Sequence, residues 1–355
     1  MSQDVIIARQ GGLGRMTLNR PKALNALTLN MVRAMVPALL DWREDPSVKA
    51  VVVDAAPGRA FCAGGDIRAL YDAGKAGTDA AYQFWFEEYQ LNTLIKEYPK
   101  PYVALIDGVT MGGGVGISVH GSHRVAGDDT LLAMPETGIG FYPDVGGTFF
   151  LPRLPEQIGA WMGLTGARLK ASDCLAAGLA THYVPTDNHP GLVAALATAK
   201  LDDDGERLET LLERYAADPG PAPLAEPRAP REHAFSAPNL ETILDRLAAA
   251  GDPWSQKQLD ALTSKSPTAL KLTFQAMRSA TGLEFRDALT QELALSTWCL
   301  TGGDFYEGVR AVIIDKDNAP QWSPPTLADV DDAAIAGAFS PLPADKALKF
   351  LGDRP

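Results

Sequence analysis

The sequence predicts an α/β fold in residues 1–190, followed by a mostly helical region in residues 191–355. In the first region, short apolar runs of strand length alternate with longer stretches of helical periodicity, which is typical of α/β proteins. Glycine-rich segments follow two of these runs, where a strand would turn into a helix. Beyond about residue 190 the pattern is almost purely helical.

The first expected elements are a hairpin, a helix and a buried strand. Residues 4–10 and 14–21 form the hairpin, residues 28–42 the helix, and residues 49–56 the strand. Because the run "KAVVVDAA" is continuously apolar, we expect both faces of that strand to be covered. Pro37 should bend the helix or mark its start.

The same order then recurs. A helix through residues 82–100 precedes a strand at 101–108, the glycine-rich segment 109–121 and the short run "HRVAG". Two short helices and a closing strand are expected over 154–185. The first region therefore repeats a strand, a glycine-rich turn and a helix.

The helical region contains a proline-rich stretch, residues 219–232, which we interpret as an extended connector. A helix with apolar residues at i, i+3 and i+4 is expected before it, over 205–218. Another helix should begin at Ser266 and Pro267, a favourable pair for the N-cap and first helical position.

Composition limits the classes of partner. The chain carries 44 acids and 32 bases, a formal charge of -12, which disfavours broad contact with nucleic acid or an anionic membrane. We therefore expect a small-molecule ligand, and a phosphate on it would need a local basic patch. Three widely spaced cysteines indicate neither a disulfide framework nor a zinc cluster. We therefore expect a reducing, cytoplasmic location, and no targeting segment or membrane span is recognised.

Two glycine clusters, "FCAGGDI" at 61–67 and "TMGGGVG" at 110–116, each follow an expected strand. Neither matches the P-loop pattern or the dinucleotide-binding pattern. Each cluster could simply make a tight turn. Two such turns facing each other could instead offer backbone N–H groups to one developing oxyanion, as acyl or enolate chemistry requires.

The stretch "AMPETGIGFYPDVGG" at 133–147 sets Glu136 and Asp144 among apolar and glycine residues. Glu136 follows a proline and could be an ordinary acid of a helix start. Asp144 could equally be a turn residue. In an apolar pocket the pKa of Glu136 would tend to rise, which would make it an effective base near neutral pH.

Four segments resemble the enoyl-CoA hydratase/isomerase (crotonase) superfamily, in its order and approximate spacing: "LNRPKALNALTLNMV", "GRAFCAGGDI", "KPYVALIDGVTMGGGVG" and "MPETGIGFYPDVGGT". The resemblance implies a spiral of ββα units that binds coenzyme A. It further implies that the backbone N–H groups of Gly65 and Gly113 hold the thioester carbonyl. Ala63, Asp66, Lys22 and Arg68 would then contact coenzyme A, although either base could be a solvated surface charge.

Further segments are similar to the 3-hydroxyisobutyryl-CoA hydrolase branch of the superfamily: "FEEYQLN", "GGGVGISVHG", "YPDVGGTFFLPRL", "SPTALKLTF" and "DFYEGVRAVIIDKD". Hydratases of the superfamily use two glutamates. The first falls here on Gly116, which has no side chain, and the second falls on Glu136. By resemblance Asp144 is an acid particular to this branch, and Glu88 contacts the substrate, although a glutamate pair on a helix is more often a solvated face.

The resemblance therefore implies an acyl-CoA thioesterase of valine catabolism, with Glu136 and Asp144 as catalytic residues. Coenzyme A would be part of the substrate, with no metal or other cofactor, and a homo-oligomer is possible. One alternative is an enoyl-CoA hydratase or isomerase that uses Glu136 as its single base. Another is a non-catalytic binding protein, including an RNA-binding one. Cys62, His120 and His123 are expected only to pack or to lie at the surface.

Overall fold

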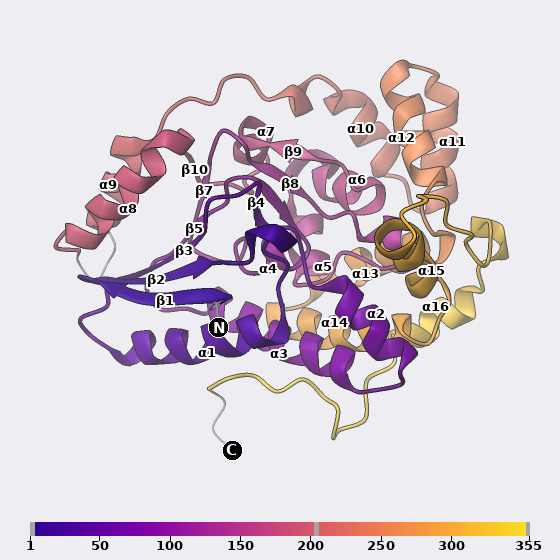
Figure 1. Cartoon of the computed structure of the whole chain (residues 1–355). Helices are drawn as coiled ribbons and strands as arrows, with labels where there is room; N and C mark the ends of the chain where they lie inside the picture. The colour runs from indigo at the N-terminus through magenta and orange to yellow at the C-terminus, as the bar shows by residue number, and fades with distance from the viewer. Residues whose placement is uncertain (1–3, 202–205, 353–355) are drawn as a thin grey trace.

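The structure is a computed structural model that describes residues 4–201 and 206–352 (Figure 1). The outer ends of the regions expected over 1–190 and 191–355 lie outside the described residues. So does the first residue of the helix expected over 205–218. None of the helices in the described part of the chain is long and apolar enough to cross a membrane.

Two sheets form the centre of the molecule. The larger has the order β1 (Val5–Gln10), β2 (Leu13–Leu18), β3 (Ala50–Ala55), β5 (Tyr102–Leu105), β7 (His123–Ala126), β10 (His182–Tyr183). The smaller has the order β4 (Ala60–Cys62), β6 (Val109–Met111), β8 (Leu131–Ala133), β9 (Leu169–Lys170). The expected hairpin is confirmed as the antiparallel pair β1 and β2, and β8 and β9 are also antiparallel. All other neighbours are parallel.

From β3 to β8, successive strands alternate between the two sheets, which produces the expected spiral of ββα units. β3, β5 and β7 enter the larger sheet, and β4, β6 and β8, each following one of them, enter the smaller sheet. Helices follow the second strand of each pair: α2 (Ile67–Lys75) and α3 (Ala80–Lys96), then α4 (Gly113–Gly116), then η2 (Glu136–Ile139) and α5 (Gly147–Phe150). The segment expected as one strand over 101–108 therefore ends at Leu105, and the chain changes sheets before β6.

The strand β3 is buried on both faces, as its apolar run predicted. Val51 and Val53 belong to the main core, while Val52 faces a second cluster on the other side of the sheet. That second cluster is closed by leucines of α8 (His189–Thr198) and α9 (Glu206–Tyr215). Figure 1 shows these two helices at the edge of the molecule opposite α11 and α12.

Helix α1 (Leu29–Glu44) runs through Pro37 rather than starting there. Its N-terminus is set by Thr28, whose hydroxyl accepts from the backbone N–H of Met31 at 3.2 Å. Its buried face, with Met35 and Leu39 at helical spacing, packs into the main core. Core burial therefore decides the length of this helix against the local cost of proline.

The C-terminal helices lie on the other side of the molecule from α8 and α9 (Figure 1). They are α10 (Arg228–Phe235), α11 (Leu240–Ala250), α12 (Pro253–Thr263), α13 (Pro267–Ser279), α14 (Phe285–Cys299), α15 (Asp304–Val309), the π-helical turn η8 (Arg310–Ile314) and α16 (Asp332–Ala338). The expected start of α13 is confirmed, because the hydroxyl of Ser266 accepts from the N–H of Ala269 at 2.9 Å.

The remaining elements are short. They are η1 (Pro21–Ala23), η3 (Leu151–Arg153), η4 (Pro155–Gln157), α6 (Ile158–Thr165), α7 (Ala171–Ala176), η5 (Thr186–Asn188), η6 (Pro223–Ala225), η7 (Ala280–Gly282) and η9 (Leu327–Asp329).

The extended connector expected over 219–232 is wrong beyond residue 222, because η6 begins at Pro223. Helix α10 begins at Arg228, and the side chain of Arg231 is fully buried. Its guanidinium donates to the carbonyl of Leu224 at 2.6 Å and to the Glu156 carboxylate at 3.1 Å. Because these bonds satisfy a buried cation, the segment packs against the fold in spite of its prolines.

Candidate active site

The first glycine cluster forms a tight turn between β4 and α2. Gly64 has a φ of +116°, a conformation open mainly to glycine. Its carbonyl accepts from Leu27 N–H at 2.8 Å, and Asp66 N–H donates to Leu27 carbonyl at 2.9 Å. These bonds hold the turn against the segment before α1. The N–H of Gly65, between them, has no acceptor among the described residues and lines a cavity.

The second glycine cluster lies beside the first. A Cβ on Gly113 would lie 3.3 Å from the Gly65 nitrogen and 2.6 Å from Oε1 of Glu88. Gly113 is the first residue of α4, so its own N–H has no acceptor within the helix. The two turns therefore meet, as oxyanion binding would require. Their role in holding a carbonyl oxygen stays a prediction.

Gly112 allows the carboxyl of Glu136 to approach this turn. A Cβ on Gly112 would stand 3.1 Å from Oε1 of Glu136 and 3.4 Å from the Cα of Gly64. Gly112 also has φ +45° and ψ −119°, which an L side chain rarely adopts. A glycine is thus needed here for both backbone conformation and space.

Three buried carboxyl groups, those of Glu88, Glu136 and Asp144, line the same cavity. Glu88 is on α3, Glu136 opens η2, and Asp144 lies in the loop before α5. Oε1 of Glu88 and Oε2 of Glu136 have no hydrogen-bond partner among the described residues. The structure thus gathers the three acids that the sequence singled out, while their roles stay predictions.

Burial shapes the charge state of all three acids. It raises the pKa of Glu136 well above its usual range, and the neighbouring Asp144 raises that pKa further. The pKa of Glu88 is also raised well above its usual range, mainly by burial and further by the charges of Asp144 and Glu292. Burial raises the pKa of Asp144 to about 7, opposed by a hydrogen bond from Tyr89. These groups can therefore exchange protons near neutral pH.

The loop that carries Asp144 has an unusual backbone. Val145, a β-branched residue, has φ +52°, and Gly146 follows at φ +84°. The ring nitrogen Nε2 of His120 contacts the Val145 carbonyl at 2.7 Å. Burial lowers the pKa of His120 to about 4, so the neutral ring is the form that makes this contact. His120 therefore packs, as expected, and also supports the turn.

Glu292 on α14 holds the same loop from the other side. Its carboxylate accepts from Gly146 N–H at 2.7 Å, and from the N–H and hydroxyl of Thr148 at 3.0 and 2.5 Å. Burial raises its pKa to about 8, and these donors counter that rise. Sequence reasoning missed Glu292 and Tyr89. Only their apolar surroundings on long helices signal that the side chains are buried.

No side chain can be accommodated at Gly116, the position where a hydratase of the superfamily would carry its first glutamate. A Cβ there would stand 2.7 Å from Cβ of Val145 and 2.9 Å from Nδ2 of Asn92. The space is filled by the loop that presents Asp144.

The cavity has a volume of about 470 Å³ and opens between α2, η2 and η8. Ala63 lines it, while Lys22 and Arg68 do not, and Arg68 instead pairs with Asp72 at 2.9 Å. Asp66 caps α2 and pairs with Arg20 at 3.3 Å. Contact of Ala63, Asp66, Lys22 and Arg68 with coenzyme A stays a prediction.

Two cations that sequence reasoning missed, Arg168 and Lys265, line this cavity. Burial lowers the pKa of Lys265, and the charge of Arg168 lowers it further. An anion bound between them would relieve that unfavourable interaction. The cavity therefore combines carboxyls with the local positive charge that the acidic chain would need for a phosphate.

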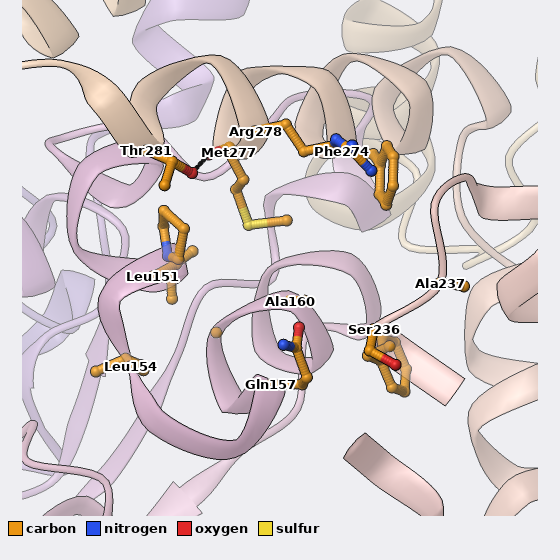
Figure 2. Close-up of a pocket in the computed structure, with 13 residues that line it drawn as sticks. Leu151, Leu154, Gln157, Ala160, Ser236, Ala237, Phe274, Met277, Arg278 and Thr281 are labelled. Atoms are coloured by element: carbon orange, nitrogen blue, oxygen red, sulfur yellow. Dashed lines mark hydrogen bonds between the residues drawn. The ribbon is translucent and has the colours of Figure 1, made fainter. Parts of the chain in front are cut away.

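A second cavity, of about 250 Å³, lies between η3, α6 and α13. Figure 2 shows its lining, which is mostly apolar around Leu151, Phe274 and Met277. The hydroxyl of Thr281 is already engaged, since it donates to the Met277 carbonyl at 3.1 Å. No acid, histidine or cysteine is among the described residues that line it. It offers no acid–base group. The candidate active site is the cavity in which the buried Glu88, Glu136 and Asp144 lie beside the two glycine turns.

Comparison with known proteins agrees with the geometry. The family model described as enoyl-CoA hydratase/isomerase matches residues 13–339. The "3-hydroxyisobutyryl-CoA hydrolase, mitochondrial" of Xenopus tropicalis is 48% identical over 344 residues, which cover 96% of this chain and 89% of that protein. A carnitinyl-CoA dehydratase structure from Mycobacterium thermoresistibile has 40% identity and a TM-score of 0.92, covering 99% of this chain and 100% of its own. An enoyl-CoA hydratase structure from Rhodobacter sphaeroides has 40% identity and a TM-score of 0.88, covering 98% and 100%.

These findings correct one expectation and confirm another. The expected cytoplasmic location is contradicted, because the Xenopus tropicalis relative is described as mitochondrial. The resemblance seen in the glycine clusters and the two acids is confirmed over most of the chain. The chain belongs to the enoyl-CoA hydratase/isomerase family.

Proposed function

We propose that this protein is a thioesterase that hydrolyses 3-hydroxyisobutyryl-CoA, or a similar short 3-hydroxyacyl-CoA, to the free acid and coenzyme A in valine catabolism. One observation carries the proposal: three buried carboxyls line the cavity into which the paired glycine turns also open. The 48% identical relative described as that hydrolase supports the substrate class. Coenzyme A enters here as part of the substrate, and the proposed steps call for no other cofactor.

The thioester carbonyl oxygen would accept from the backbone N–H groups of Gly65 and Gly113. Both N–H groups are fixed by the turns described above, so they need no reorganisation as negative charge develops on the oxygen. Glu88 stands next to Gly113, and a charged carboxylate there would oppose the oxyanion. Its raised pKa keeps Glu88 neutral, which allows it to donate to the oxygen or to a hydroxyl of the acyl group.

Glu136 is the group that attacks or activates, and it does so in its ionised form, which its raised pKa makes less abundant but more basic. As a base it takes a proton from water, and the resulting hydroxide adds to the carbonyl carbon. As a nucleophile it forms a mixed anhydride, which water then cleaves. In both routes the carbon–sulfur bond breaks and the thiolate takes a proton. Asp144 would supply that proton, since its pKa of about 7 leaves it partly protonated at neutral pH.

The rival activity within the family is hydration or isomerisation with Glu136 as a single base. The two solved structures described as a dehydratase and a hydratase keep that rival open. The packed space at Gly116 counts against the two-glutamate hydratase mechanism, since its first glutamate has no room there, and the single-base rival is left to the assay. Thiol release separates the activities, because only hydrolysis liberates coenzyme A.

The test is thiol release from 3-hydroxyisobutyryl-CoA by the wild-type protein and by Glu136→Gln. We expect the substitution to lower kcat by at least about a hundredfold with folding intact, because acid–base catalysis alone contributes about that much. Glu87→Gln, on the solvent side of α3 where Glu87 pairs with Arg33 at 2.6 Å, is the matched control. Full activity in Glu136→Gln, or hydration of enoyl-CoA without thiol release, would contradict the proposal.

A further inference from the structure

A chain of hydroxyl groups leads from Asp144 to the backbone of α14. The hydroxyl of Tyr89 lies 2.8 Å from Oδ2 of Asp144 and 2.7 Å from Oγ of Ser296. Oγ of Ser296 lies 2.8 Å from the hydroxyl of Tyr142, which lies 2.6 Å from the carbonyl oxygen of Glu292. The chain thus joins α3, the loop that carries Asp144, and α14. The side chains that form it, those of Asp144, Tyr89, Ser296 and Tyr142, are all buried.

Each of these four oxygen–oxygen contacts is short enough to require a hydrogen between the two atoms. The hydroxyls of Tyr89, Ser296 and Tyr142 bring one hydrogen each. The carbonyl of Glu292 only accepts, so it brings none. Four contacts therefore share three hydroxyl hydrogens, and one contact is left for a hydrogen from the Asp144 carboxyl.

With Asp144 protonated, every contact is satisfied in one direction. The carboxyl donates to Tyr89, Tyr89 to Ser296, Ser296 to Tyr142, and Tyr142 to the carbonyl of Glu292. With Asp144 ionised, Tyr89 must donate to the carboxylate. The single hydroxyl hydrogen of Ser296 can then serve its contact with Tyr89 or its contact with Tyr142, but not both. In the other contact, two oxygen lone pairs face each other. Such a contact is unfavourable in a site away from water.

The charged and titratable groups that face Asp144 do not offset this preference. They come from η2, α3, the loop and α14, and each is an acid, a phenol or a thiol: Glu136, Glu88, Tyr89, Tyr142, Glu292 and Cys299. None of these groups supplies positive charge that would favour the carboxylate.

We propose that Tyr89, Ser296 and Tyr142 form a hydroxyl relay that holds Asp144 as a neutral acid, with the carbonyl of Glu292 as its fixed end. This inference deepens the proposed function, on which it rests for the role of Asp144 as proton donor. Tyr89, Ser296 and Tyr142 act through Asp144, so they are positioning residues.

The relay predicts opposite shifts for variants that remove similar hydroxyls. Tyr142→Phe or Ser296→Ala removes one oxygen of the unfavourable contact, so the carboxylate becomes acceptable and the pKa of Asp144 should fall by about one unit. Tyr89→Phe removes the donor to the carboxylate, so the pKa should rise by about one unit. Tyr142 does not touch Asp144 in the contacts above. A change in the pKa of Asp144 in Tyr142→Phe would therefore have to pass through Ser296 and Tyr89, as the relay requires.

The experiment measures the carboxyl of Asp144 directly, by titrating the full-length protein labelled with ¹³C at aspartate carboxyls. Asp144→Asn assigns the signal. Tyr102→Phe is the matched control, since Tyr102 is also buried and its hydroxyl donates to a backbone carbonyl, that of Ile117 at 2.9 Å. The pH profile of thiol release is recorded for the same proteins, and its alkaline limb should move with the titration.

A fall in the Asp144 pKa in Tyr142→Phe and Ser296→Ala, a rise in Tyr89→Phe and no shift in Tyr102→Phe would support the relay. A Tyr142→Phe protein that titrates like Tyr102→Phe would overturn it. If Tyr142→Phe does not fold, Ser296→Ala decides alone, because it removes the same link. If the wild type releases no thiol, the proposed function fails while the titration still decides the relay.

Discussion

Individual residues show where sequence reasoning succeeded and where it could not. Glu87 and Glu88 are neighbours, yet Glu87 pairs with Arg33 at the surface while Glu88 is buried in the cavity. A pair of glutamates on a helix gives no local sign of which one turns inward. The sequence pointed to Glu136 and Asp144 because apolar and glycine residues surround them in the chain. It did not point to Glu292, because the hydrogen-bond partners of that residue are distant in the chain.

Gly116 provides the test at this scale. Gly116→Glu should restore no hydratase activity, because the new side chain meets Val145 and Asn92 instead of the cavity. It should also lower the free energy of unfolding by about 1–3 kcal/mol through overpacking. Denaturant unfolding and an enoyl-CoA hydration assay measure the two effects. Gly282→Ala, where a Cβ meets nothing within 4 Å, is the control for stability.

Gain of hydration activity in Gly116→Glu with unchanged stability would show that the space at this position is available.

Among the elements, the loop before α5 and the helix α14 depend on each other. The loop contributes the acid and adopts a strained turn at Val145. The helix contributes the Glu292 carboxylate, which accepts hydrogen bonds from the backbone N–H groups of that turn. Local sequence predicted a turn at Asp144 from its proline and glycines. It could not predict the acceptor, because that bond forms only when the C-terminal helices pack against the first region.

Glu292→Gln tests this dependence. The glutamine amide has one acceptor oxygen, whereas the carboxylate has two. The backbone N–H of either Gly146 or Thr148 would therefore face the amide NH₂ group, which is a donor. We expect a loss of about 1–3 kcal/mol in unfolding free energy and a lower kcat, since a buried N–H is left without its partner. Thermal unfolding and thiol release check both.

Glu284→Gln, at the exposed start of the same helix, is the matched control and should change neither quantity. Wild-type stability and kcat in Glu292→Gln would mean that the turn holds its shape without this carboxylate.

For the whole molecule, the sequence predicted the order of strands and helices well because each apolar run is short and bounded by glycine or proline. It predicted less about how distant segments meet. The stretch 219–232 looked extended, yet the buried guanidinium of Arg231 anchors it through an ion pair with the partly exposed Glu156. The helix α8, which begins near the expected boundary at 190, covers a face of the larger sheet. Such contacts depend on packing between segments that local patterns do not encode.

Net charge has its consequence at the same scale. The chain has a charge of -12, yet Arg168 and Lys265 lie together at the cavity. We infer that this pair, rather than Lys22 or Arg68, receives the phosphates of coenzyme A. Arg168→Gln should raise KM by about 10- to 100-fold with little change in kcat, since one charge-assisted contact is worth about 1.5–3 kcal/mol. Its KM should also depend less on salt than that of the wild type.

Arg68→Gln is the decisive comparison, because Arg68 was the base expected from sequence to contact coenzyme A. Steady-state kinetics at low and high salt should leave its KM near the wild-type value. A larger rise in KM for Arg68→Gln than for Arg168→Gln would reverse our assignment.

The bond between Glu292 and the Asp144 loop also bears on how proteins of this kind should be recognised in genomes. A search that relies on the short motif around Glu136 and Asp144 reads only one half of a two-part signature. A homologue could retain "PDVGG" and yet lack an acid at the position of Glu292, and its aspartate would then be left without the support seen here. Assigning hydrolase chemistry from sequence should therefore ask for both halves, the loop and the distant glutamate, together.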